Sequence, residues 1–282
     1  MGQNLQQLKR RIKISNNVSK IANVMEMIAM SKIHKAQELV EAHNPYLKKI
    51  EYITYRTVLE KKILKTNKKT IKEKCNKKLV YIISADKGLC GNLIANILKK
   101  IISYTNYNDY IVTIGKKIAS NTIMRNYNVI ASFNIGSCVP KYDNIYPIID
   151  IAKKIYLSNK ITKISIIYTK FKNILIQEPY VNEVFPIKNC EILKKEDRIN
   201  YIFEPSIKLI FEDLISCYLE SIFFNSLINS YASEQAARII AMKNAKDNAN
   251  EISTYLTNIY NKYRQEKITN EILDIANFKH GI

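Results

Sequence analysis

The sequence has few residues that break secondary structure: only six glycines and six prolines in 282 residues, and no tryptophan. A chain of this length with so few turn-forming residues is expected to form long elements. Neither glycine nor proline occurs between Gly2 and Pro45, or between Pro205 and Gly281. Such intervals permit very long helices. The remaining breakers lie in the middle of the chain, which predicts a compact domain with turns there.

Other scarcities exclude whole classes of protein. The cysteines number five, an odd count without a Cys-x-x-Cys pair, which argues against a disulfide framework and favours a reducing compartment. With three histidines and no cluster at metal-ligand spacing, no metal site is predicted. There is no apolar signal core, no transit-like stretch and no uncharged apolar run of about eighteen residues. Any work at a membrane is therefore expected to be peripheral.

Positive charge dominates, with 44 Lys and Arg against 25 Asp and Glu. Residues 1–50 carry nine basic and three acidic side chains, and residues 60–78 carry nine lysines and two glutamates, whereas residues 206–282 are nearly neutral. This balance favours an acidic partner, which could be nucleic acid, an anionic membrane or an acidic protein surface. Residues 60–78 are predicted to be a basic, solvated connector.

The two breaker-poor intervals carry apolar residues at coiled-coil spacing. In the C-terminal interval the 4-3-4-3-4 pattern comprises Ala245, Ala249, Ile252, Leu256, Ile259 and Tyr263. In the N-terminal interval a 3-4-3 pattern follows Leu5, Leu8 and Ile12, and comprises Val18, Ile21, Met25 and Ile28. Two such seams at opposite ends of one chain predict an antiparallel intramolecular coiled coil. The alternative is two core-facing helices of an ordinary bundle.

The middle of the chain alternates between short apolar runs and helical patterns. Strands are predicted at 79–84, 110–114, 129–135, 161–168 and 174–184, the last being an edge strand interrupted by Pro179. Helices are predicted at 92–104, 116–127 and 145–158. This alternation predicts a Rossmann-like α/β domain with a mostly parallel sheet. The predicted organisation is an N-terminal helix at 1–59, the connector at 60–78, the α/β domain at 79–205 and a C-terminal helix at 206–282.

Candidate chemistry in this middle region is sparse. A turn at 88–91 (GLCG) lies between a strand and a helix, but it lacks the fuller phosphate-binding patterns, so no cofactor is predicted. Cys90 has no neighbouring histidine to act as a base, and Ser84 with Asp86 lacks the histidine of a triad. No catalytic residue is predicted, although an α/β nucleotide-dependent enzyme with a helical extension stays open. A basic coiled-coil protein that binds nucleic acid also stays open, without interleaved aromatic residues to favour it.

Three stretches together resemble the gamma subunit of the rotary F-type ATP synthase. They are residues 8–17 (LKRRIKISNN) running on to 24–32 (VMEMIAMSK), residues 84–92 (SADKGLCGN), and residues 233–245 (SEQAARIIAMKNA) followed by 260–271 (YNKYRQEKITNE). The last pair is the most specific. The sequence departs from the family pattern at Asn23, where a basic residue is usual, and at Asn92, where a second glycine is usual.

The resemblance implies a non-catalytic rotor. Its coiled coil would fill the cavity of the alpha–beta hexamer, and its base would sit on the c-subunit ring beside epsilon, in a complex that also holds delta, a and b. Proton flow through the ring would turn the shaft and cycle the beta catalytic sites. The implied location is peripheral, on the cytoplasmic side of the bacterial plasma (inner) membrane.

The resemblance also implies which residues make contacts. Those matched to the beta subunit are Arg264, Gln265, Thr269, Glu271, Met25 and Arg238. Those matched to the c ring and epsilon are Ser31, Lys32, Lys35, Phe203 and Glu204. A guanidinium suits bidentate pairing with carboxylate, which fits the expected role of Arg264.

Overall fold

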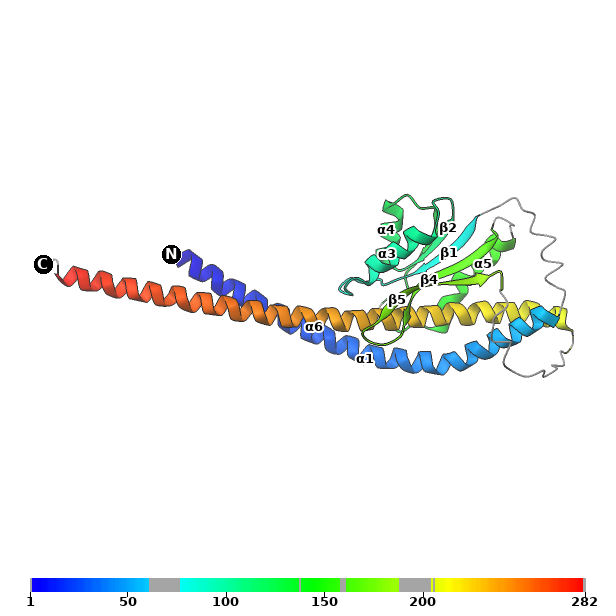
Figure 1. Cartoon of the computed structure of the whole chain (residues 1–282), viewed down its shortest axis with the longest axis horizontal. Helices are drawn as coiled ribbons and strands as arrows, with labels where there is room; N and C mark the ends of the chain where they lie inside the picture. Colours follow the sequence, from blue (N-terminus) through cyan, green and yellow to red (C-terminus); the bar gives the residue numbers. More distant parts are fainter. Residues whose placement is uncertain are drawn as a thin grey trace. The chain divides into compact units, whose positions relative to one another are not determined.

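Two long helices dominate the computed structural model, which describes residues 2–60, 77–136, 138–157, 161–187, 204 and 206–280. Helix α1 spans Gly2–Glu60 and helix α6 spans Ile207–His280 (Figure 1). Pro45 lies inside α1, on an exposed position, and does not end the helix. Most of the predicted connector, residues 61–76, falls outside the described residues.

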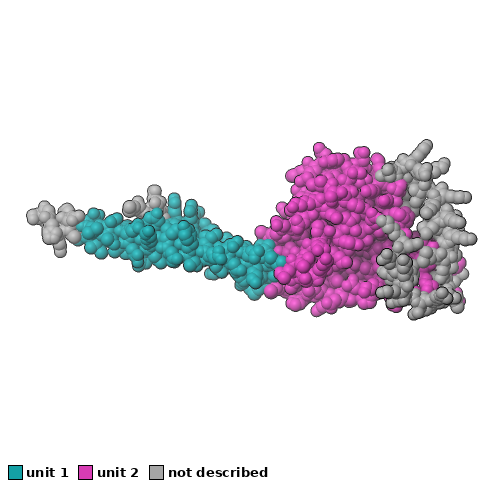
Figure 2. All heavy atoms as spheres, in the orientation of Figure 1, with its two compact units in different colours: residues 1–29, 238–282 teal, residues 30–237 magenta. Residues whose placement is uncertain are grey.

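The chain forms two compact units (Figure 2). Unit 1 comprises residues 1–29 and 238–282, and unit 2 comprises residues 30–237. Each long helix therefore contributes to both units. The four segments predicted from the sequence are a different division, drawn along the chain from composition and pattern. The boundaries of those segments stay a prediction.

Unit 2 contains a five-stranded sheet in the order β3-β2-β1-β4-β5. Strand β1 pairs in parallel with both β2 and β4, β2 pairs in parallel with β3, and β4 pairs antiparallel with β5. The predicted mostly parallel sheet is thus confirmed. The strands are β1 (Lys78–Ile83), β2 (Tyr110–Ile114), β3 (Val129–Phe133), β4 (Lys163–Phe171) and β5 (Gln177–Phe185).

The predicted interruption of the last strand is wrong. Strand β5 begins at Gln177 rather than at residue 174, and it runs through Pro179, which lies opposite Thr169 of β4. Proline is tolerated because β5 is an edge strand, where one side of the backbone needs no donor for the ladder. The first part of the predicted strand, including Ile174, lies in the loop between β4 and β5 instead.

Helices cover both faces of the sheet. Helices α3 (Leu93–Tyr104) and α4 (Lys116–Met124) pack on the face that carries Val80 and Ile82. Helix α5 (Tyr146–Leu157), preceded by the 3-10 turn η1 (Tyr142–Ile145), packs on the face that carries Leu79 and Tyr81, together with parts of α1 and α6. Burial on both faces explains why the central strands are continuously apolar in sequence.

Asp86 ties together two loops at the carboxyl ends of the parallel strands. Its carboxylate accepts the backbone N–H of Lys116 at 2.9 Å and that of Gly136 at 2.6 Å. The first donor opens α4 and the second follows β3. Asp86 therefore has a structural partner for each carboxylate oxygen.

Asp86→Ala is expected to lower the free energy of unfolding by about 1–3 kcal/mol, because two backbone donors lose a charged acceptor. Asp86→Asn is the matched control, since its amide oxygen keeps one acceptor and should retain part of this stability. Urea unfolding followed by near-ultraviolet circular dichroism would measure both values. Equal loss in the two variants would contradict the proposed use of both carboxylate oxygens.

The helices of unit 1 meet along a different stripe of α1 from the one predicted. Val18, Ile21, Met25 and Ile28 are exposed, Ile21 at 58%, so their assignment to the seam is wrong. The buried positions are Ser15, Ala22, Glu26 and Ala29, with Ala22 at 4%, and they continue the spacing that begins with Leu5, Leu8 and Ile12. Small side chains let two helix backbones approach closely, which is why serine and alanine occupy this seam.

The predicted seam on α6 is correct in part. Ala249 is buried and Leu256 is half-buried, as expected. Ile252 is exposed and its neighbour Ser253 is buried instead. Tyr263 is also exposed, at 49%.

Candidate functional site

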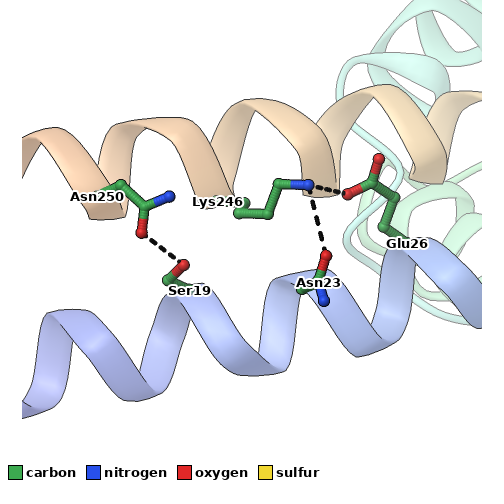
Figure 3. Close-up of polar contacts among 5 residues, drawn as sticks. All are labelled: Ser19, Asn23, Glu26, Lys246 and Asn250. Carbon is green, nitrogen blue, oxygen red and sulfur yellow. Dashed lines mark hydrogen bonds and ion pairs between the residues drawn. The ribbon is translucent and has the colours of Figure 1, made fainter.

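Side-chain hydrogen bonds join α1 to α6 in unit 1. The hydroxyl of Ser15 donates to the carbonyl oxygen of Ala249 at 2.7 Å. The hydroxyl of Ser19 donates to Oδ1 of Asn250 at 2.7 Å (Figure 3). The hydroxyl of Ser253 on α6 donates to Oδ1 of Asn16 on α1, and Nζ of Lys246 donates to Oε2 of Glu26, so higher numbers on α6 pair with lower numbers on α1. The two helices therefore run antiparallel, and the predicted coiled-coil pairing of the chain ends is confirmed.

A charged contact continues this row of polar links. Nζ of Lys246 donates to Oε2 of Glu26 at 2.8 Å and to Oδ1 of Asn23 at 3.4 Å (Figure 3). Asn23 stands where the resemblance leads one to expect a cation, and the cation at this place comes from α6. The hydrogen bond from Lys246 to Glu26 raises the pKa of Lys246 above its ordinary value of 10.5.

The raised pKa of Lys246 defines the pH range over which its contact with Glu26 stabilises the fold. A lysine whose pKa is higher in the folded than in the unfolded chain stabilises the fold fully below its unfolded pKa. That contribution is lost as the pH rises through the folded value, which lies above 10.5. The contact between Lys246 and Glu26 is therefore intact throughout the physiological range.

The residues wrongly assigned to the seam form, together with Ile14, an exposed apolar stripe on α1. Its members recur every three or four residues, so they share one face of the helix: Ile14, Val18, Ile21, Met25 and Ile28. Val24 and Met27 widen the stripe and are half exposed as well. Contiguous exposed apolar surface of this kind marks a protein interaction site.

The C-terminal end of α6 presents polar and apolar side chains to solvent. Because both helices rise 1.5 Å per residue, the pairing of Ser19 with Asn250 places Gly2 opposite α6 at about residue 267. Arg264 and Gln265 lie just before that level and Thr269 and Glu271 just past it, and all four predicted contact residues are exposed.

Local contacts hold some of these side chains on the helix. The hydroxyl of Thr269 donates to the carbonyl oxygen of Gln265 at 2.9 Å. Glu271 pairs with Lys267 at 3.5 Å, with both side chains at the surface. Such a solvent-exposed pair contributes little to stability, so Glu271 can exchange Lys267 for another partner at little cost.

The other predicted contact residues fall in both units. Met25 belongs to the apolar stripe, and Arg238 is half-buried on α6 in the same unit. Ser31, Lys32 and Lys35 lie on the part of α1 that belongs to unit 2, and Lys32 is half-buried. Glu204 is exposed, and Phe203 lies outside the described residues. The predicted residues thus form several surfaces rather than one site.

The chemistry-bearing groups of the sheet domain are engaged in the fold. Cys90 is buried, and its thiol donates to the carbonyl oxygen of Lys87 at 3.9 Å. The carboxylate of Asp86 binds two backbone N–H groups, as described above. Over the described ranges, no group of three or more His, Cys, Asp or Glu side chains is placed to hold a metal ion.

Sequence reasoning missed the polar residues that join the helices. The seam was sought among apolar side chains, which left out Ser19, Glu26, Lys246 and Asn250, and Asn23 was noted only as a departure from the family pattern. The signal was present in the spacing, since Ser15, Ser19, Ala22 and Glu26 continue the heptad of the first turns. Hydropathy does not reveal such positions.

Comparison with known sequences gives the same family throughout the chain. The family model described as ATP synthase matches residues 4–277. An ATP synthase gamma chain of Dehalococcoides mccartyi is 35% identical over 278 residues, covering 97% of each chain. The gamma chain of Clostridium novyi is 33% identical and covers 98% of this chain and 97% of its own.

Solved structures share the fold. The rotor of the Euglena gracilis mitochondrial ATP synthase contains a chain that matches with a TM-score of 0.72 and 17% identity, covering 95% of this chain and all of that one. A chain in the central stalk and c ring of the Tetrahymena thermophila mitochondrial ATP synthase matches with a TM-score of 0.58 and 23% identity, covering 80% and 99%.

The fold therefore defines a class of protein in which a small Rossmann-like domain is combined with an antiparallel pair of long terminal helices. The chain belongs to the ATP synthase gamma-chain family. Gamma chains are subunits of a membrane-bound complex. Among the described residues, no helix is long and apolar enough to cross a membrane.

Proposed function

We propose that this chain is the non-catalytic rotor of a proton-translocating ATP synthase. In this role it couples rotation of the c ring to conformational cycling of the beta catalytic sites. The observation that carries the proposal is the antiparallel pairing of α1 and α6 in unit 1, where several polar links join the two helices. A pair of helices joined in this way resists twisting better than a single helix.

The mechanism needs no bond chemistry from the rotor itself. An asymmetric shaft presents different side chains to the three beta subunits at each rotational position. Because it contacts each conformation of beta with a different free energy, it shifts the population of open and closed sites as it turns. The exposed apolar stripe on α1 lies on one face of the pair, which supplies the asymmetry.

The predicted contact residues divide this work. Arg264 and Gln265, with Thr269 and Glu271, would bind the beta subunit through polar contacts at the C-terminal end of α6. Met25 and Arg238 would contact beta further along the shaft. Ser31, Lys32, Lys35, Phe203 and Glu204 would meet epsilon and the c ring.

The partners follow from this role. They are the alpha–beta hexamer, the epsilon subunit and the c ring, with delta, a and b elsewhere in the complex. The chain would be held at the cytoplasmic side of the bacterial plasma (inner) membrane through these partners. The similar structures are parts of a rotor and of a central stalk with its c ring, which supports this assignment.

Affinity purification of the tagged chain from its native membranes tests the proposal. Recovery together with alpha and beta subunits is the expected result. Recovery without them would overturn it. Saturable nucleotide binding by the isolated chain would instead support the enzyme alternative, and salt-sensitive binding to nucleic acid would support the other one.

Arg264→Ala is expected to slow coupled ATP synthesis and hydrolysis in the assembled complex while leaving the fold intact. Loss of a charged hydrogen bond to beta would cost about 1.5–3 kcal/mol. Lys262→Ala is the matched control, because Lys262 is an exposed cation on the same helix that is matched to no contact. Unchanged turnover of the Arg264→Ala complex would remove the proposed role of this residue.

A further inference from the structure

Between residues 15 and 29 of α1, the seam of unit 1 is poor in large apolar side chains. On α1 the buried or half-buried positions between residues 15 and 29 include Ser15, Ser19, Ala22 and Ala29. On α6 the facing residues include Ala249 and Ser253, and the large buried side chains, Ile239 and Met242, lie at the beginning of this stretch. Coiled coils ordinarily fix their register by inserting large side chains into matching holes. Small residues repeated at heptad spacing provide little shape to distinguish one register from another.

The contact between Lys246 and Glu26 does distinguish registers. The side chains of Lys246 and Glu26 are 27% and 12% exposed, so the glutamate lies largely within the seam. Sliding one helix by one heptad would place Ser253 or Ile239 opposite Glu26. Neither side chain carries a charge, and the glutamate would then lie in the seam without a cation. An unpaired charge in such a place is strongly unfavourable.

Asn23 makes the arrangement more selective. Its Oδ1 accepts a second hydrogen bond from the same ammonium group, one turn of α1 away from Glu26. Two acceptors on successive turns define the height of Lys246 along α1 (Figure 3). The neighbouring links between Ser19 and Asn250, and between Ser253 and Asn16, agree with the same alignment.

We propose that Glu26, Lys246 and Asn23 form a register lock, a contact that fixes the axial position of α6 against α1 in unit 1. These are positioning residues. They set the axial position of the apolar stripe of α1 relative to Arg264 and Gln265 of α6. The consequence for rotation rests on the proposed function, whereas the register itself is a property of the chain alone.

The distance between two labels on the full-length chain tests the register lock. Ketone-bearing residues at Asn17 and Lys243, both exposed and on different helices, would accept hydroxylamine spin labels and leave the native cysteines unmodified. A slip of one heptad moves the helices by about 10 Å along each other. The two labels are offset along the axis, so pulsed electron paramagnetic resonance would resolve the slip as a second distance.

The chain without further substitution should give one distance. Glu26→Gln and Lys246→Gln should each add a second population displaced by about 10 Å. The exchanged pair, Glu26→Lys with Lys246→Glu, should return to the single distance. Lys267→Gln is the matched control, because it breaks an exposed ion pair within α6, and it should leave the distance unchanged.

Two results would overturn the register lock: a single unchanged distance in both Gln variants, or failure of the exchanged pair to restore one distance. The exchanged pair tests the register lock even if a Gln variant loses helical content. The measurement uses the chain without its partners. The register lock can therefore be overturned by the distance measurement even if affinity purification recovers the alpha and beta subunits. It can also be supported if the purification recovers neither subunit.

Discussion

Phe223→Ala is expected to lower the free energy of unfolding of unit 2 by about 3–5 kcal/mol, as is typical for removal of a buried aromatic ring. Phe223 lies on α6 and is fully buried. Its ring meets that of Tyr81 on β1 edge to face, with the centroids 4.7 Å apart and the planes at 81°. The same core cluster holds Leu79 and Ile148, so this ring joins α6 to the sheet and to α5.

Tyr81→Phe is the matched control for this prediction. It keeps the ring that packs on Phe223 and removes only the hydroxyl, which donates to the carbonyl oxygen of Ile148 at 3.0 Å. Loss of that hydrogen bond should cost about 1 kcal/mol. The near-ultraviolet circular dichroism of the tyrosines would follow unfolding in urea, since the chain has no tryptophan. A smaller loss for Phe223→Ala than for Tyr81→Phe would contradict the assignment of Phe223 to the core.

The packing at Phe223 also bears on the proposed rotor. In unit 2 the first half of α6 is held by large side chains in a continuous core. In unit 1 the second half also buries Ile239 and Met242, but small side chains and polar links to α1 make up more of its contacts with that helix. Burial of large apolar side chains therefore dominates in the first half, whereas in the second half interhelical hydrogen bonds add to a smaller apolar contact.

The sheet domain could be predicted from sequence because its signals are local. Each strand is a short apolar run bounded by turn residues, and parallel central strands are apolar on both faces. Gly115, directly after β2, and Gly88, shortly after β1, marked two of these boundaries. Strand β5 was placed less well, because an exposed run around Ile174 is as apolar as a strand although it forms a loop.

The helix pair was predicted as a pair, but its contact face was not. The long intervals without breakers sufficed to predict two long helices. The face requires knowledge of which residues approach the other helix, and the most apolar stripe of α1 turned out to be exposed. An apolar stripe in a rotor is available to a partner, so hydropathy identified the outer surface rather than the seam. The contact roles of Arg264 and the other matched residues stay predictions.

Gly115→Ala is expected to lower the free energy of unfolding by about 3 kcal/mol or more, because backbone strain and steric overlap act together there. Gly115 connects β2 to α4 with φ at +123°, a conformation that residues with a side chain rarely adopt. A Cβ at this position would overlap the carbonyl oxygen of Ser84 and lie 3.0 Å from its carbonyl carbon. Those atoms are backbone at the end of β1, where the N–H of Ser84 already donates to Ile114, so they cannot move aside.

Two other glycines separate strain from overlap. Gly136 has φ at +83° but open space around its Cβ position, so Gly136→Ala should cost about 1–3 kcal/mol through strain alone. Gly88 has no positive φ, and a Cβ added there would meet no other atom within 4 Å, so Gly88→Ala should change stability by less than about 0.5 kcal/mol. Urea unfolding of the three variants should therefore rank them Gly115, Gly136, Gly88. If Gly115→Ala were no worse than Gly136→Ala, the close approach of β2 and β1 at this turn would not constrain the fold, and glycine would be needed there for its backbone conformation only.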